Sequence, residues 1–247
     1  MANEEIARRK FLLGAGVAGT AVAAGLSDTT PAQAQTPVSQ VPANQVPAAA
    51  SQPAGEPPTY LTLNAAEVAF FTAAFDTLIP ADGITPSGSD CGLVTFADRQ
   101  LASAWGGGAK MYRSGPFRKG KPEHGYQLPL SPREFFGAGI AAVNAWTRKT
   151  YGKDFDRLDA KQREEALKAL EADRAQLVSF NGREFFSNLL QLAMDGFFAD
   201  PIYGGNKNKV AWKMIGFPGL PAVYANLIDE YRHKRYVVEP QSIADFS

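Results

Sequence analysis

The first 58 residues most constrain the fold of this chain. They comprise two segments, 1–34 and 35–58, and neither has a composition that can form a hydrophobic core. Residues 1–34 open with a charged stretch, continue as an Ala- and Gly-rich apolar run, and end in Pro31-Ala32-Gln33-Ala34. A charged start, an apolar middle and a small-residue exit are the three parts of an export signal. The adjacent arginines followed by Phe and Leu are typical of a twin-arginine signal, which predicts a periplasmic protein. The residues that carry this pattern are Arg8, Arg9, Phe11, Leu12, Ala32 and Ala34.

Two other interpretations of the apolar run are weaker. Residues 11–26 are shorter than the ~20 strongly apolar residues that a membrane-spanning helix needs, and glycines interrupt them. Residues 14–19 match G-x-G-x-x-G, but a dinucleotide site requires a preceding buried strand and an acidic residue about 20 positions further on. Basic residues stand where the strand should be, and residues 35–55 contain no Asp or Glu. We therefore interpret the run as part of the export signal.

Residues 35–58 are built from Pro, Ala, Gln, Val and Ser, with Glu56 as the only charge. Such a segment buries too little apolar area to offset the cost of ordering its backbone, so we expect a disordered linker. A strap lying along a partner is the alternative. The folded part is then residues 59–247, which suits one domain with a substantial core.

Charge and cysteine content exclude several classes of protein. Lys plus Arg and Asp plus Glu number 25 each, so no overall field favours nucleic acid or an anionic membrane. Cys91 is the only cysteine, which excludes an internal disulfide, a C-x-x-C-H haem site and a Cys-ligated cluster made by this chain alone. An odd cysteine in an exported protein suggests an intermolecular disulfide. A small residue at a helix start explains Cys91 equally well.

The rest of the sequence predicts a mainly α, single irregular helical domain with long loops. Asn64 with Glu67, and Ser131 with Glu134, form capping boxes, and Asp90 is a candidate cap for a further helix. The only β-like run is residues 236–238. The predicted helices are one from Asn64 to Pro80, one from Asp90 to about Gly106, one from Ser131 to about Gly152, one over 159–172 and one over 182–198.

No catalytic signature is present in the sequence, which lacks H-E-x-x-H, G-x-S-x-G and a Walker loop. We predict no catalytic, cofactor-binding or metal-binding residue in this chain. His124 and His233 are far apart in sequence and are expected to be structural or solvated. Asp195 and Asp200 flank an aromatic segment and could serve as an acid–base pair. A helix cap and a turn residue are the commoner roles for such aspartates.

The most distinctive segment is residues 195–206, Asp-Gly-Phe-Phe-Ala-Asp-Pro-Ile-Tyr-Gly-Gly-Asn, followed by Trp212. Asp-Pro ends a helix, Gly-Gly-Asn permits positive φ, and the loop carries large aromatic rings. These rings suit an interface anchor, and core packing of a tight corner is the alternative. The candidate interface residues are Phe198, Asp200, Pro201, Tyr203, Gly204, Gly205, Asn206 and Trp212.

This segment, together with Trp-Lys-x-Ile-Gly-Phe-Pro-Gly at 212–219, resembles the gluconate 2-dehydrogenase subunit 3 family. Further matching pieces are Phe-x-x-Leu-Ile-Pro at 75–80, Tyr-Gln at 126–127 before Leu-Ser-Pro at 130–132, and Tyr-Gly-Lys-x-Phe at 151–155. The resemblance covers roughly residues 60–220. It implies a small, or gamma, subunit of a bacterial membrane-bound dehydrogenase for sugars and sugar acids.

The resemblance also implies a helper role. In such complexes a large subunit holds FAD and oxidises the substrate, and a cytochrome c subunit with haem c takes the electrons to the membrane. The small subunit carries the signal read by the twin-arginine translocase, and the large subunit travels with it. A stand-alone exported enzyme using Asp195 and Asp200, or a periplasmic binding module for sugar acids with a pocket under the Tyr203 loop, are the alternatives.

Overall fold

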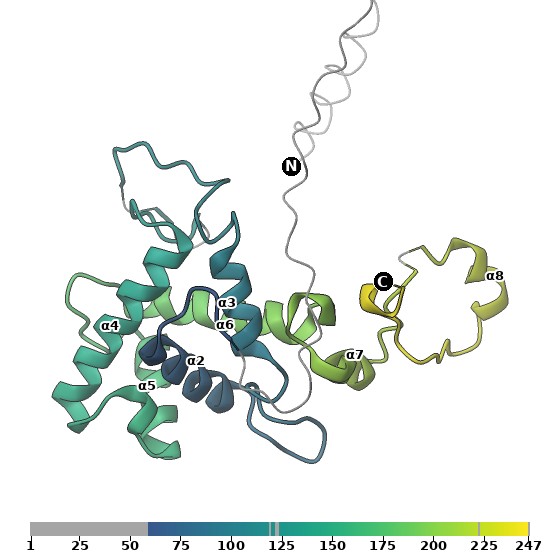
Figure 1. Ribbon diagram of the computed structural model, residues 1–247, viewed down its shortest axis with the longest axis horizontal. Helices are drawn as coiled ribbons and strands as arrows, with labels where there is room; N and C mark the ends of the chain where they lie inside the picture. The colour runs from purple at the N-terminus through teal and green to yellow at the C-terminus, as the bar shows by residue number, and fades with distance from the viewer. Residues whose placement is uncertain (1–58, 119, 122–123, 222, 247) are drawn as a thin grey trace, which may run out of the picture. The chain divides into compact units, whose positions relative to one another are not determined.

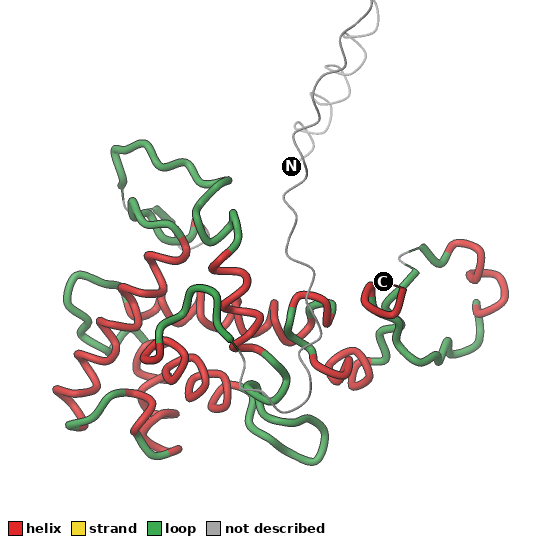
Figure 2. The backbone as a smooth tube through the Cα atoms, viewed as in Figure 1, coloured by secondary structure: helices red, strands yellow, loops and turns green. Residues whose placement is uncertain are grey.

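The computed structural model describes residues 59–118, 120–121, 124–221 and 223–246, which form helices joined by loops (Figures 1 and 2). No strand occurs in these described ranges, and one isolated bridge joins Gly219 to Gln241. The prediction of a mainly α fold is confirmed, while the export signal and the linker lie outside the described residues. The longer helices are α2 (Ala65–Leu78), α3 (Leu93–Ala102), α4 (Pro132–Tyr151), α5 (Ala160–Glu171) and α6 (Gly182–Phe198).

Short helical pieces complete the element order. A single turn, η2 (Phe155–Arg157), connects α4 to α5. The chain after α6 passes through η3 (Pro201–Tyr203), η4 (Lys207–Lys209) and α7 (Val210–Ile215). It ends in η5 (Ala225–Leu227), α8 (Ile228–Tyr231) and η6 (Ile243–Phe246).

The helix starts follow from capping side chains. Asn64, Ser131 and Asp159 each accept a backbone N–H of the first turn, and the side chain three residues later bonds back to the cap. These reciprocal bonds satisfy two donors that a helix N-terminus otherwise leaves open. Gly152 ends α4 with a φ of 76°, a conformation that glycine adopts without steric cost. The predicted starts of α2 and α4 and both bounds of α6 are confirmed.

The prediction of a helix from Asp90 to about Gly106 was wrong at both ends. Helix α3 begins at Leu93 after Gly92, whose φ is 87°, and no side chain caps it. Asp90 instead accepts a hydrogen bond from the Ser87 hydroxyl at 3.0 Å. A Cβ at Gly92 would lie 2.3 Å from the Gly204 carbonyl oxygen, so a contact distant in sequence sets this helix start. The helix ends at Ala102 rather than near Gly106.

Phenylalanine dominates the core, which surrounds α2. The ring of Phe70 lies 4.9 Å from that of Phe155 and 5.9 Å from that of Phe185, measured between centroids. Aromatic pairs at such distances stabilise the fold beyond the gain from burying their surface area. Phe70 and its neighbour Phe71 are both fully buried, although adjacent residues of a helix point about 100° apart. Helices α3, α4, α5 and α6 all contact α2, so its buried surface is wider than one stripe.

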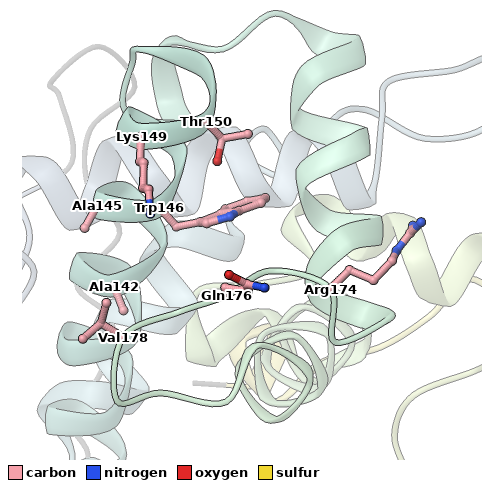
Figure 3. Close-up of a pocket in the computed structure, with 8 residues that line it drawn as sticks. All are labelled: Ala142, Ala145, Trp146, Lys149, Thr150, Arg174, Gln176 and Val178. Carbon is pink, nitrogen blue, oxygen red and sulfur yellow. The ribbon is translucent and has the colours of Figure 1, made fainter.

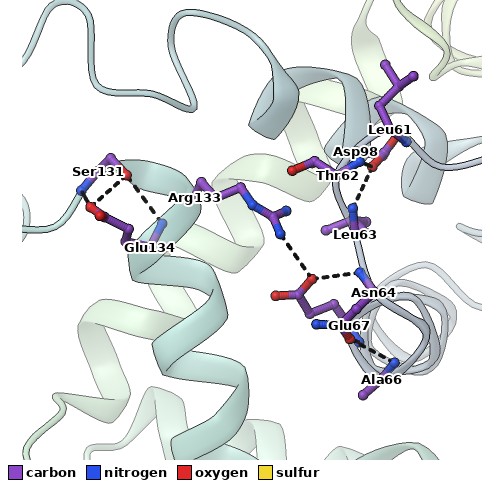
Figure 4. A network of polar contacts seen from close by, with 10 residues as sticks. All are labelled: Leu61, Thr62, Leu63, Asn64, Ala66, Glu67, Asp98, Ser131, Arg133 and Glu134. Atoms are coloured by element: carbon purple, nitrogen blue, oxygen red, sulfur yellow. Dashed lines mark hydrogen bonds and ion pairs between the residues drawn. The ribbon is translucent and has the colours of Figure 1, made fainter.

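A polar network fixes the point where the chain enters this core (Figure 4). The buried carboxylate of Asp98 on α3 accepts hydrogen bonds from the backbone N–H groups of Leu61, Thr62 and Leu63 at 2.6, 2.9 and 2.9 Å. Charge-assisted bonds of this kind are among the stronger ones in proteins. The segment before α2 is therefore held to α3.

Candidate partner-binding site

The aromatic segment singled out in the sequence forms a tight corner after α6. Asp200 accepts the N–H of Ile202 at 3.0 Å, and Pro201 opens the single turn η3. Gly204 then turns the chain with a φ of 99°, and Asn206 has a φ of 45°. The prediction that Gly-Gly-Asn supplies positive φ is confirmed for the first and third of these residues.

Close backbone approach explains the glycine pair in the corner. A Cβ at Gly205 would lie 2.1 Å from the carbonyl oxygen of Gly196 on α6. The Gly204 carbonyl in turn faces Gly92 at the start of α3, and the N–H of Lys207 donates to the Cys91 carbonyl at 3.0 Å. The corner is thereby packed between α6 and the start of α3.

Buried side chains hold the corner from inside. Asn206 is fully buried; its amide donates to the Ala199 carbonyl and its oxygen accepts the Ala211 N–H, both at 2.9 Å. Trp212 is 6% exposed, and its indole N–H donates to the Phe198 carbonyl at 2.9 Å. Both side chains therefore satisfy backbone groups of the corner, which is the structural alternative offered by the sequence.

The other candidate interface residues lie nearer the surface. Tyr203 is the exposed aromatic of the corner, with 37% of its surface accessible, and Phe198, Asp200 and Pro201 are half-buried. The structure thus gathers the eight candidate residues in one place. It divides them between interior supports and a small accessible surface centred on Tyr203.

The corner also carries the end of the chain. Asp200 uses its second oxygen to accept the Ile243 N–H at 2.9 Å. Lys209 donates to the Pro240 carbonyl at 2.9 Å and to Asp245 at 2.6 Å. The hydrogen bond from Lys209 lowers the pKa of the Asp245 carboxyl. These contacts return residues 240–246 to the corner, where η6 packs against η3.

A short backbone contact closes the loop between these two points. The N–H of Leu220 donates to the Gln241 carbonyl at 2.9 Å, and the Gln241 N–H donates to the Pro218 carbonyl at 3.0 Å. A Cβ at Gly219 would lie 2.0 Å from the Gln241 carbonyl oxygen, so glycine is required here. We call residues 218–220 with 240–242 the neck, and the described residues of 221–239, which leave and return through it, the C-terminal arm (Figure 1).

The C-terminal arm exposes its apolar side chains. Val223, Ile228 and Val237 are 70%, 58% and 72% accessible. The β-like run predicted at 236–238 lies in this arm without forming a strand. Exposed apolar side chains that gather into one patch are typical of an interaction site.

The two aspartates considered for acid–base chemistry have structural partners. Both oxygens of Asp200 accept backbone N–H groups, as described above. The carboxylate of Asp195 accepts the side-chain amide of Gln191, one turn earlier on α6, at 2.7 Å. Among the described residues, no cluster of three or more His, Cys, Asp or Glu side chains could hold a metal ion.

Cys91 lies inside the body, next to the start of α3. It is 1% exposed, and its Sγ lies 3.7 Å from the Pro86 carbonyl, to which it donates. Burial is the first cause that raises the pKa of this thiol, and the neighbouring Asp90 is the second. The intermolecular disulfide stays a prediction, and the burial of the sulfur counts against it.

A pocket of about 350 Å³ lies between α4 and the segment that follows α5 (Figure 3). It does not lie beneath the Tyr203 corner, where the sequence predicted the pocket of a binding module. The indole of Trp146 lies across it, with Thr150 and Gln176 nearby and the Arg174 guanidinium pointing away at the rim. Lys149 also lines the pocket. An aromatic face with amide, hydroxyl and ammonium groups suits a small hydroxylated anion.

The comparison with known families identifies the class to which this helical body belongs. The family described as gluconate 2-dehydrogenase subunit 3 matches residues 65–219, from the first residue of α2 to the neck. The chain belongs to this family, and the resemblance seen in the sequence is confirmed. It is accordingly a subunit of an oxidoreductase complex. Comparison with curated proteins and with solved structures gave no match.

Two polar residues that hold distant segments together, Asp98 and Lys209, were not predicted from the sequence. Asp98 stood among apolar residues on a predicted helix, and an acid there signals a buried partner. Lys209 gave no such signal, because its partners Pro240 and Asp245 lie more than thirty residues away.

In the part of the chain that the structure covers, no helix is both long and apolar enough to span a membrane.

Proposed function

We propose that this chain is the non-catalytic small subunit of an exported, membrane-associated, FAD-dependent dehydrogenase for gluconate or another sugar or polyol. Family membership over residues 65–219 is the observation that carries the proposal. The chain binds the FAD-bearing large subunit and stabilises it during export. The twin-arginine pattern at Arg8 and Arg9 supports passage of the pair through the twin-arginine translocase to the periplasm.

In this proposal, the electrons taken from the substrate do not pass through this subunit. FAD sits in the large subunit and haem c in a cytochrome c subunit, which links the complex to the inner membrane. The contribution of this chain is surface, supplied by the Tyr203 corner and the apolar side chains beside it. Tyrosine is one of the residue types enriched at binding hot spots, and Tyr203 is the exposed aromatic of the corner.

Copurification tests the proposal directly. The full-length chain, carrying an affinity tag within residues 35–58, is expressed in its native host and purified from the periplasm. We expect a flavoprotein with sugar or sugar-acid dehydrogenase activity to accompany it, and the flavoprotein to stay cytoplasmic when Arg8 and Arg9 are both changed to Lys. A tagged chain that emerges alone, or that oxidises a sugar acid without a companion, would contradict the proposal.

The Trp146 pocket favours one other function, a periplasmic binding module for sugar acids. Its lining offers an aromatic face and polar groups to a carboxylated sugar. Ligand binding raises the unfolding temperature of the binding protein. A thermal shift of the chain alone in gluconate, lost in W146A, would support this second function over the first.

A further inference from the structure

We infer that the C-terminal arm is the surface that grips the large subunit, with its aliphatic side chains against apolar surface and its basic tip against an acidic rim. This inference rests on the proposed function and says which part of the chain performs it. The buried residues of the corner, Asn206 and Trp212, then act as the mount of the arm.

The internal contacts of the arm give it a shape but no core. No described residue between 220 and 239 is buried. Tyr236 stacks edge to face with Tyr231 at 4.8 Å and with Tyr224 at 6.0 Å, and the Tyr224 hydroxyl donates to the Gly219 carbonyl at 2.6 Å. The tyrosines pack on one another, while Val223, Ile228 and Val237 remain in water. Water exclusion by a partner would stabilise these aliphatic groups.

The arm is nevertheless mounted on a firm base. Its neck is closed by two backbone hydrogen bonds, and Lys213 pairs with Glu239 at 2.7 Å beside it. Trp212, held from inside the corner, lies against Gly219 of the neck. A loop fixed at both ends loses less conformational entropy on binding than a free tail does. The mount therefore prepares the arm for association.

The charges of the arm indicate which kind of partner it binds. Its tip carries Arg232, Lys234 and Arg235 around His233. Arg232 pairs with Asp229 at 2.8 Å, and Glu230 is the other acid of the tip, so its three bases outnumber its two acids. Lys234 and Arg235 have no acidic partner among the described residues. A two-fold contact with a second copy would bring the same patch to both sides of the interface, and like charges placed together are unfavourable. The linker carries only Glu56 and cannot neutralise the tip. A different subunit with an acidic rim fits both features.

The test compares two sets of variants of the full-length tagged chain in the native host. The arm variant I228D/V237D places carboxylates in the proposed contact, and K234E/R235E reverses the tip. The control I84D/Y112D changes two body residues that are at least as exposed, at 71% and 83%. We expect I228D/V237D to lower the flavoprotein recovered per tagged chain at least tenfold, K234E/R235E to lower it several-fold, and the control to leave it unchanged.

Folding and self-association are measured on the same proteins. The thermal unfolding midpoint of the arm variants should match wild type, because the arm contributes nothing to the core. Equal recovery of flavoprotein by wild type and I228D/V237D would overturn the arm as the contact while leaving the proposed function intact. A wild-type chain that recovers no flavoprotein would instead remove the proposed function. Light scattering that shows a dimer of the chain alone, split by I228D/V237D, would assign the arm to a second copy and overturn the inference.

Discussion

The helical body and the C-terminal arm are organised in opposite ways. In the body, α2 is surrounded by four helices and its phenylalanines are fully buried. In the arm, aliphatic side chains such as Val237 face water, and polar contacts at the neck hold the backbone. The body is therefore stabilised by burial and the arm by its attachment. The family match ends at residue 219 in the neck and does not include the arm.

The comparison assigns different roles to aromatic residues in the two regions. Phe185 fills the core, where it lies 6.2 Å from Phe136 between ring centroids. Tyr203 and the tyrosines of the arm keep part of their surface in water. A change in the body should consequently alter stability, and a change in the arm should alter association.

The largest expected effect is in the body. Phe185→Ala should lower the free energy of unfolding by about 3–5 kcal/mol, because a fully buried ring leaves a cavity that the packed helices cannot close. Val237→Ala in the arm should change it by less than about 0.5 kcal/mol, as surface substitutions do. Urea unfolding followed by circular dichroism measures both. Comparable losses for the two variants would show that the arm belongs to the cooperative unit.

A smaller effect is expected at the joint between the two regions. Gly205→Ala should cost about 1–3 kcal/mol, because the added methyl group meets the Gly196 carbonyl and forces the corner apart. Gly83→Ala is the matched control, since a Cβ there meets no atom within 4 Å. Hydrogen exchange should show faster exchange of the Leu220 and Gln241 amides only in the first variant. Unchanged exchange at the neck would contradict the role of the corner as a mount.

The smallest effect is a loss of stability at high pH. Tyr126 stacks on Phe135 with centroids 4.1 Å apart, and burial raises its pKa from 10.0 to about 12. The folded state thus favours the neutral phenol. This stabilisation is complete below the unfolded pKa near 10 and is lost as the pH rises towards 12. Tyr126→Phe should flatten the decline in unfolding free energy over this range, and Tyr112→Phe at a position that is 83% exposed should not. Parallel pH profiles for wild type and Tyr126→Phe would refute this explanation.

Local patterns predicted the body well. The capping boxes at Asn64 and Ser131 and the bounds of α6 needed only near neighbours, and the structure has them as expected. The start of α3 was missed because the Gly204 carbonyl fixes the conformation of Gly92 from across the fold. The candidate site was predicted in part. Its residues do lie together in the corner, but Trp212 is buried and does not reach the surface.

The sequence by itself determined the mainly helical fold, most of the long helices and the family, because caps, apolar periodicity and the Asp-Pro-Ile-Tyr-Gly-Gly-Asn segment are encoded in adjacent residues. Only the tertiary structure decided that Trp212 supports the corner and that Lys209 holds the end of the chain. The sequence gives the size, polarity and charge of each side chain. Which side chains reach water and which reach a distant carbonyl depends on contacts between segments far apart in sequence.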